Sequence, residues 1–114
     1  VNAHATSTLS GDRSEALALR TVFAAAGASP RVSSTKGLTG HSLSMSGAME
    51  TAFCALALRD GFIPGNANLI EPDEACAGLD LPRATLDRTP ATLLKNSSGF
   101  GGSNVCHVLR HWPA

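Results

Sequence analysis

Three ionisable side chains stand in a long stretch of the chain that is otherwise small, hydroxylic or apolar. Within residues 32–58 the only titratable groups besides Cys54 are Lys36, His41 and Glu50. Because a charge is almost never fully buried unless it is paired or used, we expect Lys36 and Glu50 to form a buried pair. The alternative is a surface pair on a partly exposed helix, which the apolar surroundings disfavour.

Two histidines could supply acid–base or hydrogen-bonding chemistry. His41 lies just before a predicted helix, whose dipole disfavours a protonated ring, and a neutral imidazole there can donate to developing negative charge. Taken alone, His41 is better explained by local capping or packing. His4 ends a predicted strand and is followed by Thr6 and Thr8, a place where sites gather in α/β folds.

The cysteines show no sign of a nucleophile or a metal site. Cys54, Cys76 and Cys106 lie far apart without CxxC spacing, and an odd, scattered set argues against disulfides and zinc. This usage favours a reducing compartment, and we expect a cytoplasmic protein. None of the three has the electropositive helix-start setting that lowers a thiol pKa.

Two helices should position these side chains. Residues 12–26 have helical periodicity, with Asp12 as a cap and Gly27 as a stop. Residues 44–59 are apolar nearly all round, which predicts a central, fully packed helix.

Strands and loops occupy the rest of the chain. We expect a short strand over residues 31–34, a turn over 35–42, and a long surface excursion with one or two short strands over 62–91. The final segment predicts two strands joined at Gly99 to Gly102. The element order β-α-β-α-β-β predicts an α/β layer with a mixed sheet and a buried central helix.

Composition limits the function classes. The formal net charge is zero and aromatic residues make up 4% of the 114 residues, which argues against a nucleic-acid partner. No apolar run approaches a transmembrane span, so we expect no membrane association. Val1 begins inside a predicted strand, so residues 1–114 read as one incomplete domain of a larger protein.

Four segments occur in the order and spacing of a known family: VNAHATST, SSTKGLTGHS, GAMETAF and NSSGFGGSN. Together they resemble the β-ketoacyl-[acyl carrier protein] synthases, condensing enzymes of the thiolase-like fold, and most closely the synthase I/II type. The resemblance spans essentially the whole chain and matches the C-terminal portion of that family. It implies decarboxylative Claisen condensation of an acyl thioester with malonyl-acyl carrier protein, in fatty-acid or polyketide synthesis.

The resemblance also implies roles for single residues. His4 and His41 match the two histidines of a Cys-His-His triad, and Lys36 matches the catalytic lysine, with Glu50 as its structural support. The cysteine nucleophile would come from the remainder of the synthase chain. Further matches are the pantetheine-holding Thr6 and Thr8, and the gating Phe100, whose backbone N–H completes an oxyanion hole.

The family requires no catalytic cofactor but holds a structural monovalent cation near the glutamate. The matching oxygen-bearing residues, which suit a hard cation, are Asn2, Glu50, Asn96 and Asn104. The implied partners are acyl carrier protein, carrying acyl and malonyl thioesters, and a second copy of the synthase in a homodimer.

The chain departs from the family pattern at three places. Ala5 stands where the family usually has glycine, Ser98 stands where an aromatic residue precedes GFGG, and Ser44-Met45-Ser46 replaces a Gly-Ala-Ala-like segment. Two other hypotheses stay open. One is a non-catalytic homologue such as a chain-length-determining partner subunit. The presence of both histidines and of Lys36 argues against it. The other is a binding module without chemistry.

Overall fold

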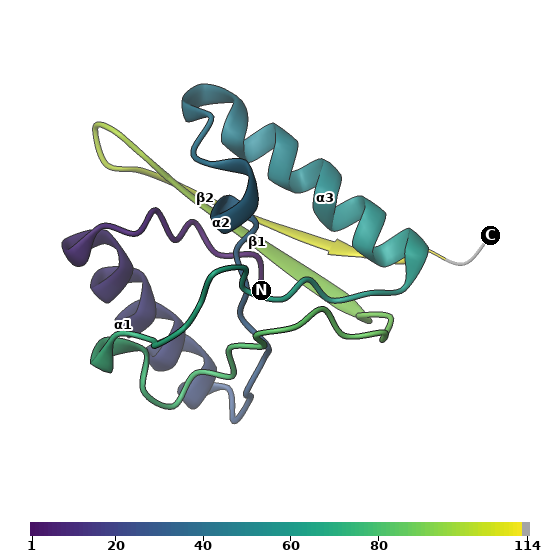
Figure 1. The fold of residues 1–114 in the computed structure, drawn as a ribbon, viewed down its shortest axis with the longest axis horizontal. Helices are drawn as coiled ribbons and strands as arrows, with labels where there is room; N and C mark the ends of the chain where they lie inside the picture. Colours follow the sequence, from purple (N-terminus) through teal and green to yellow (C-terminus); the bar gives the residue numbers. More distant parts are fainter. Residues whose placement is uncertain (113–114) are drawn as a thin grey trace.

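The computed structural model describes residues 1–112. Its helices and strands follow the chain in this order: α1 (Leu9–Ala25), α2 (Lys36–Thr39), the 3₁₀ turn η1 (Leu43–Met45), α3 (Ser46–Asp60), the 3₁₀ turn η2 (Glu74–Cys76), β1 (Thr92–Gly99) and β2 (Ser103–Arg110). Figure 1 shows α3 lying along the β1–β2 hairpin, with α1 on the other side of the N-terminal segment.

The N-terminal segment joins the two halves of the molecule. Asn2 forms parallel bridges to Ser33 on one side and to Lys95 of β1 on the other. β1 pairs with β2 in antiparallel register, from Thr92 opposite Arg110 to Gly99 opposite Ser103. The regular sheet therefore has two antiparallel strands, and the parallel part of the expected mixed sheet consists of the isolated bridges of Asn2. The candidate site residues that follow Asn2 in the chain are therefore attached to the centre of the fold.

In place of the first two expected strands the structure has only isolated bridges, because side chains bind the neighbouring backbone N–H groups. Glu15 of α1 accepts the backbone N–H groups of His4 and Ala5, at 2.8 Å each. Asn66 Oδ1 accepts the N–H of Ser34 at 2.9 Å. Since these N–H groups are used by side chains, they cannot extend a backbone ladder.

Helix α1 begins three residues earlier than the sequence predicts. Its first residue is Leu9, so Asp12 lies in the first turn rather than at the cap, and the prediction of an Asp12 cap was wrong. The helix ends as expected before Gly27, which has φ +61° and donates its N–H to Ala24. Its buried face, Ala16 and Leu19, packs toward the N-terminal segment and η2.

Helix α3 ends as predicted at Gly61, whose φ is +78°. Only one face of the helix is buried by residues 1–112, through Ser46, Glu50, Cys54, Ala57 and Leu58. The opposite face, including Ala52 and Leu56, is exposed, so the prediction of a fully packed helix does not hold within the described part of the chain.

Two small cores hold these elements. One joins Cys54, Ala57 and Leu58 of α3 to Leu93 of β1, and the other joins Ala3, Leu19 and Val32. Among residues 1–112 no helix has both the length and the apolar character that a membrane span requires.

Candidate active site

The structure brings the two histidines together. Their ring centroids lie 5.4 Å apart and the rings meet edge to face at 89°. His4 comes from the N-terminal segment just beyond the Asn2 bridges, and His41 comes from the loop between α2 and η1. Residues 37 positions apart in the sequence thus present two imidazoles to one place.

The rings open onto a cleft with a volume of about 210 Å³. The start of α3 and the β1–β2 hairpin form its walls, and hydroxyl groups and glycine dominate the lining. Besides the histidines it is lined by Leu43, Ser44, Ser46, Gly47, Ser97, Ser98, Gly99, Ser103 and Val105. A cleft lined mainly by serine and glycine, with two imidazoles at one place, can accept a small group such as a thioester.

A carboxylate holds the backbone of His4 in place. Glu15 accepts the N–H groups of His4 and Ala5, and the Asn96 side-chain amide donates to the same carboxylate at 2.6 Å. Glu15 was not predicted as a residue of the site. The available signal was its position in the second turn of a helix without a basic residue three or four positions away, which leaves the carboxylate free to bind outside the helix.

A buried hydroxyl holds the ring of His41. His41 Nδ1 lies 2.7 Å from Ser46 Oγ, and Ser46 Oγ lies 3.2 Å from Ser42 Oγ. Ser46 is 3% exposed and is the first residue of α3, so the hydroxyl has a fixed position. Ser46 is one of the residues that replace the Gly-Ala-Ala-like segment, so this contact depends on a departure from the family pattern.

The predicted Lys36–Glu50 ion pair forms and is buried: the side chains are 5% and 0% exposed. Its third member, Lys95 of β1, was not predicted from the sequence. Lys95 Nζ lies 2.8 Å from Glu50 Oε2, and its side chain is 1% exposed. One carboxylate therefore stands between two ammonium groups, behind the histidines.

The electrostatic surroundings favour a neutral His4. Burial, followed by the positive charge of Lys36, lowers the pKa of His4 below its ordinary value of 6.5. Glu15 opposes this shift, while His41 and Lys95 add to it. A neutral imidazole has one N–H group, which it can donate to an oxyanion.

Thr6 and Thr8 lie directly beside His4, where α1 begins. Their hydroxyl oxygens are 3.1 Å apart, and Ser7 between them has φ +60°. Gly11 leaves room for this pair, because a Cβ there would lie 2.5 Å from Thr8 Oγ1. The two threonines thus form one hydroxyl pair, and neither of them lines the histidine cleft.

Phe100 is separated from the histidines in the described chain. It lies at the tip of the β1–β2 hairpin, fully exposed, followed by Gly101 and Gly102 with φ of +79° and +82°. The side chain does not line the cleft, although Ser98 and Gly99 do.

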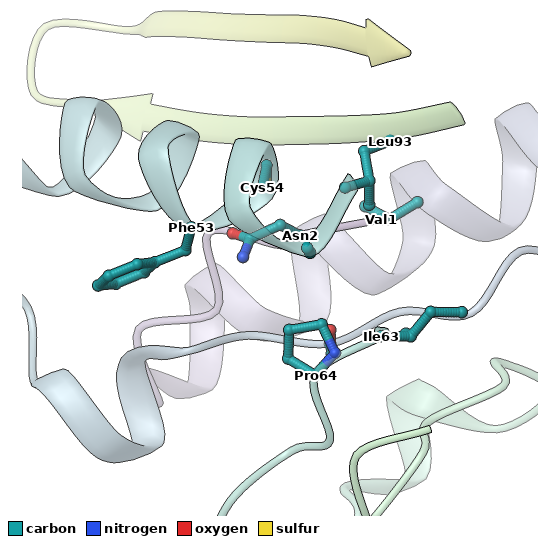
Figure 2. A pocket seen from close by; sticks show the side chains of 9 residues that line it. Val1, Asn2, Phe53, Cys54, Ile63, Pro64 and Leu93 are labelled. Carbon is teal, nitrogen blue, oxygen red and sulfur yellow. The ribbon is translucent and has the colours of Figure 1, made fainter. Parts of the chain in front are cut away.

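None of the three cysteines lines the cleft. Cys54 lies on the same buried face of α3 as Ser46 but about two turns further along, in a small cavity with Asn2 and Leu93 (Figure 2). Burial raises the pKa of Cys54, and burial together with Asp73 raises that of Cys76. Cys106 is exposed on β2, opposite Asn96. A thiolate nucleophile is therefore not supplied at this cleft by residues 1–112.

Residues 1–70 match the family model of the β-ketoacyl synthase C-terminal domain. The chain belongs to the β-ketoacyl synthase family. The 3-oxoacyl-[acyl-carrier-protein] synthase 1 of Escherichia coli (strain K12) is 44% identical over 110 residues, which cover 96% of this chain and 27% of that protein. The chain thus spans about a quarter of the length of the curated relatives it matches.

Solved ketosynthases share the fold. A structure described as the ishigamide ketosynthase/chain length factor has a TM-score of 0.89 and 32% identity, covering 98% of this chain and 27% of that one. A second, a type II polyketide synthase acyl-carrier protein in complex with its ketosynthase bound to the hexaketide, has a TM-score of 0.89 and 28% identity, covering 98% and 28%. The predicted family and its thiolase-like α/β fold are confirmed.

The residues that match the ketosynthase cation ligands do not fit a metal ion here. Glu50 already faces two ammonium groups. The backbone carbonyl of Asn96 accepts a hydrogen bond from Lys95, and Asn104 is exposed on β2 opposite Ser98. Of the implied ligands, Asn2 and Glu50 each have a buried side-chain oxygen without a hydrogen-bond partner among the described residues. The Glu50 oxygen, Oε2, is nevertheless 2.8 Å from the ammonium of Lys95, so its charge is paired.

Proposed function

We propose that this chain is the C-terminal part of a condensing enzyme that joins an acyl group to the two-carbon unit of malonyl-acyl carrier protein, in fatty-acid or polyketide synthesis. One observation carries the proposal: two histidine rings 5.4 Å apart at a cleft lined mainly by serine and glycine, with a buried lysine–glutamate–lysine cluster nearby. The names of the similar proteins support it.

The proposed reaction needs a stabilised enolate. An acyl group first moves from its carrier-protein thioester to a cysteine thiolate carried by the remainder of the synthase, and the carrier-protein thiolate leaves. The malonyl thioester then loses CO₂, and the electron pair of the broken C–C bond forms an enolate whose oxygen accepts hydrogen bonds from His4 and His41. The enolate carbon attacks the acyl thioester carbonyl, a new C–C bond forms, and the cysteine thiolate leaves.

Both imidazoles are suited to donate. The lowered pKa of His4 keeps its ring neutral near pH 7. A Ser46 hydroxyl that donates to His41 Nδ1 keeps the proton of that ring on Nε2, which then faces the substrate. Lys36 and Glu50 act behind the rings as the charged framework that fixes them.

The remaining matched residues bind substrate. The hydroxyl pair of Thr6 and Thr8 holds the pantetheine arm of the carrier protein. Phe100 gates the acyl pocket, and its backbone N–H completes the oxyanion hole. The two glycines that follow Phe100, both in the left-handed region, are consistent with a loop that changes conformation.

The partners follow from this assignment. The remainder of the synthase supplies the nucleophile and covers the exposed face of α3, and acyl carrier protein delivers both thioesters. A structure with the same fold contains an acyl-carrier protein bound to its ketosynthase, which supports that partner. We further propose a homodimer that acts in the cytoplasm.

Malonyl decarboxylation tests the proposal. In the full-length protein, His4→Ala or His41→Ala should lower decarboxylation of malonyl-acyl carrier protein by about 10²–10³-fold, as loss of an oxyanion donor does, while some self-acylation remains. His107→Ala, an exposed histidine on β2, is the matched control and should act like the parent. A variant without either ring that decarboxylates at the parent rate would remove that histidine from the mechanism.

A second candidate is a chain-length-determining partner subunit. The ishigamide structure, which matches at a TM-score of 0.89, names a chain length factor beside its ketosynthase. In that case the full-length parent protein would neither decarboxylate malonyl thioester nor become acylated by itself. The same assay therefore distinguishes the two candidates.

A further inference from the structure

The ammonium group of Lys95 is enclosed by oxygen atoms. Its Nζ lies 2.8 Å from Glu50 Oε2 and 2.7 Å from Ser97 Oγ, and it donates to the backbone carbonyl of Asn96. The side chain is 1% exposed, and the Glu50 carboxylate is fully buried. The head group thus has one carboxylate, one hydroxyl and one carbonyl oxygen around it.

These three kinds of oxygen are the ligands that a hard cation takes in proteins. An ammonium group has one positive charge and three donors, and that of Lys95 donates to the carbonyl and hydroxyl oxygens and pairs with the Glu50 carboxylate through its charge. The buried cluster already holds two positive charges, on Lys36 and Lys95, against one negative charge on Glu50. A metal ion added there would have to share its ligands with Lys95 and would add a third positive charge without a counter-ion.

We propose that Lys95 is a tethered cation that replaces the structural metal ion of the family. The ammonium of Lys95 on β1 fixes Glu50 on α3. Glu50 in turn holds Lys36, which begins α2 just before the loop that carries His41, and no ion from solution is bound. This inference concerns the framework of the site and holds whether or not the proposed condensation is correct.

The first test needs no variant. Unfolding of the full-length protein is followed in chloride salts of Na⁺, K⁺ and the bulky organic cation N-methyl-D-glucamine, at equal ionic strength. We expect the melting temperatures to agree within about 1 °C, because no ion is bound by the folded state. A rise of several degrees that is specific to Na⁺ or K⁺ would show that a metal ion still binds, and would overturn the proposal.

The second test empties the position of the ammonium. Lys95→Ser leaves a hydroxyl and a vacancy beside Glu50, whereas Lys95→Met fills the same space without charge. Both variants should melt below the parent, but only Lys95→Ser should regain about 3 °C or more in Na⁺ or K⁺ over N-methyl-D-glucamine. An equal response of the two variants, or none in folded Lys95→Ser, contradicts the proposal.

A structural readout completes the design. Crystals of the parent and of Lys95→Ser are soaked in Rb⁺, whose anomalous scattering locates it directly. We expect a peak beside Glu50 in Lys95→Ser and none in the parent. A peak beside Glu50 in the parent would contradict replacement of the ion by Lys95.

Discussion

Glu50 has two cationic partners, and this changes what each substitution should do. Removing Lys36 leaves the carboxylate paired with Lys95, whereas removing the charge of Glu50 leaves two buried ammonium groups facing each other. Breaking a buried pair by removing the shared partner costs about 3–5 kcal/mol. The residue that carries the single negative charge is therefore the most sensitive of the three.

We predict that Glu50→Gln in the full-length protein lowers the free energy of unfolding by about 3–5 kcal/mol. Lys36→Met should lower it by clearly less, because the charges of the cluster then balance. Chemical denaturation of both variants beside the parent gives the comparison. If Lys36→Met is as destabilising as Glu50→Gln, then Lys95 does not compensate for the missing charge.

His4 should make stability depend on pH. Its folded pKa lies below the unfolded value of 6.5, so the unfolded chain binds a proton over a pH range in which the folded protein does not. The contribution is therefore fully present above pH 6.5 and is lost as the pH falls through the folded pKa.

We predict that the free energy of unfolding of the full-length protein decreases between pH 7.5 and pH 5.5, and that His4→Gln makes this decrease shallower. His107→Gln, on the exposed strand β2, serves as the control and should leave the slope unchanged. An identical slope in the parent and in His4→Gln would show that the imidazole is not desolvated by folding.

Side-chain type and local spacing were enough to predict part of this site. The charged residues of an apolar segment indicated the Lys36–Glu50 pair, and the motifs indicated both histidines. Lys95 could not be found in the same way, because Glu50 lies far from it along the chain, and neither could the contact of Glu15 with β1. The Asn96–Glu15 hydrogen bond, for example, joins residues 81 positions apart. Only the fold decides that β1, α1 and the N-terminal segment meet.

At the scale of elements, the turn after the first bridge is strained. Ala5 has φ +30°, a region that suits glycine, and it stands where the family usually has glycine. The two N–H groups bound by Glu15 hold the backbone in this conformation. A non-glycine residue there costs about 1–3 kcal/mol, which the sequence alone could not reveal.

We predict that Ala5→Gly raises the free energy of unfolding by about 1 kcal/mol, since the relief of strain exceeds the added entropy of the unfolded chain. Ala18→Gly, in the interior of α1, is the matched control and should lower it by about 1 kcal/mol. Thermal and urea unfolding of the two variants measure both effects. A loss of stability in both variants alike would mean that the backbone at Ala5 is relaxed.

The helix boundaries show a similar division. The glycine stops after α1 and α3 were predicted correctly, because a left-handed residue at a helix end is a local requirement. The start of α1 was not, because Asp12 suits a cap by type alone. The expected strands near residues 1–4 and 31–34 ended early, since Glu15 and Asn66 take the N–H groups that a ladder would need.

At the scale of the whole molecule, the described chain presents histidines without a nucleophile. We predict that residues 1–114 alone, even when folded, neither become acylated nor condense acyl thioesters. The reason is that Cys54 and Cys76 have raised pKa values and that no cysteine lines the histidine cleft. Claisen condensation needs a thiolate, which a helix N-terminus stabilises in the proposed enzyme class.

Mass spectrometry of the isolated chain after incubation with an acyl-carrier-protein thioester provides the measurement. The full-length protein, treated in parallel, is the positive control and should be acylated once per chain. Stoichiometric acylation of Cys54, Cys76 or Cys106 in the isolated chain, followed by turnover with a malonyl donor, would show that the nucleophile has been misplaced.

The contacts of the Glu15 carboxylate determine how local unfolding of α1 would affect the site. From α1, this carboxylate accepts hydrogen bonds from the backbone N–H groups of His4 and Ala5 and from the side-chain amide of Asn96 on β1. Three separate parts of the chain therefore meet at one side chain. Helix α1 therefore cannot undock while His4 keeps its place. A substitution on the surface of that helix would lower the turnover rate of the proposed enzyme before it caused a measurable loss of secondary structure. Catalytic rate would then serve as an early gauge of local unfolding in this half of the molecule.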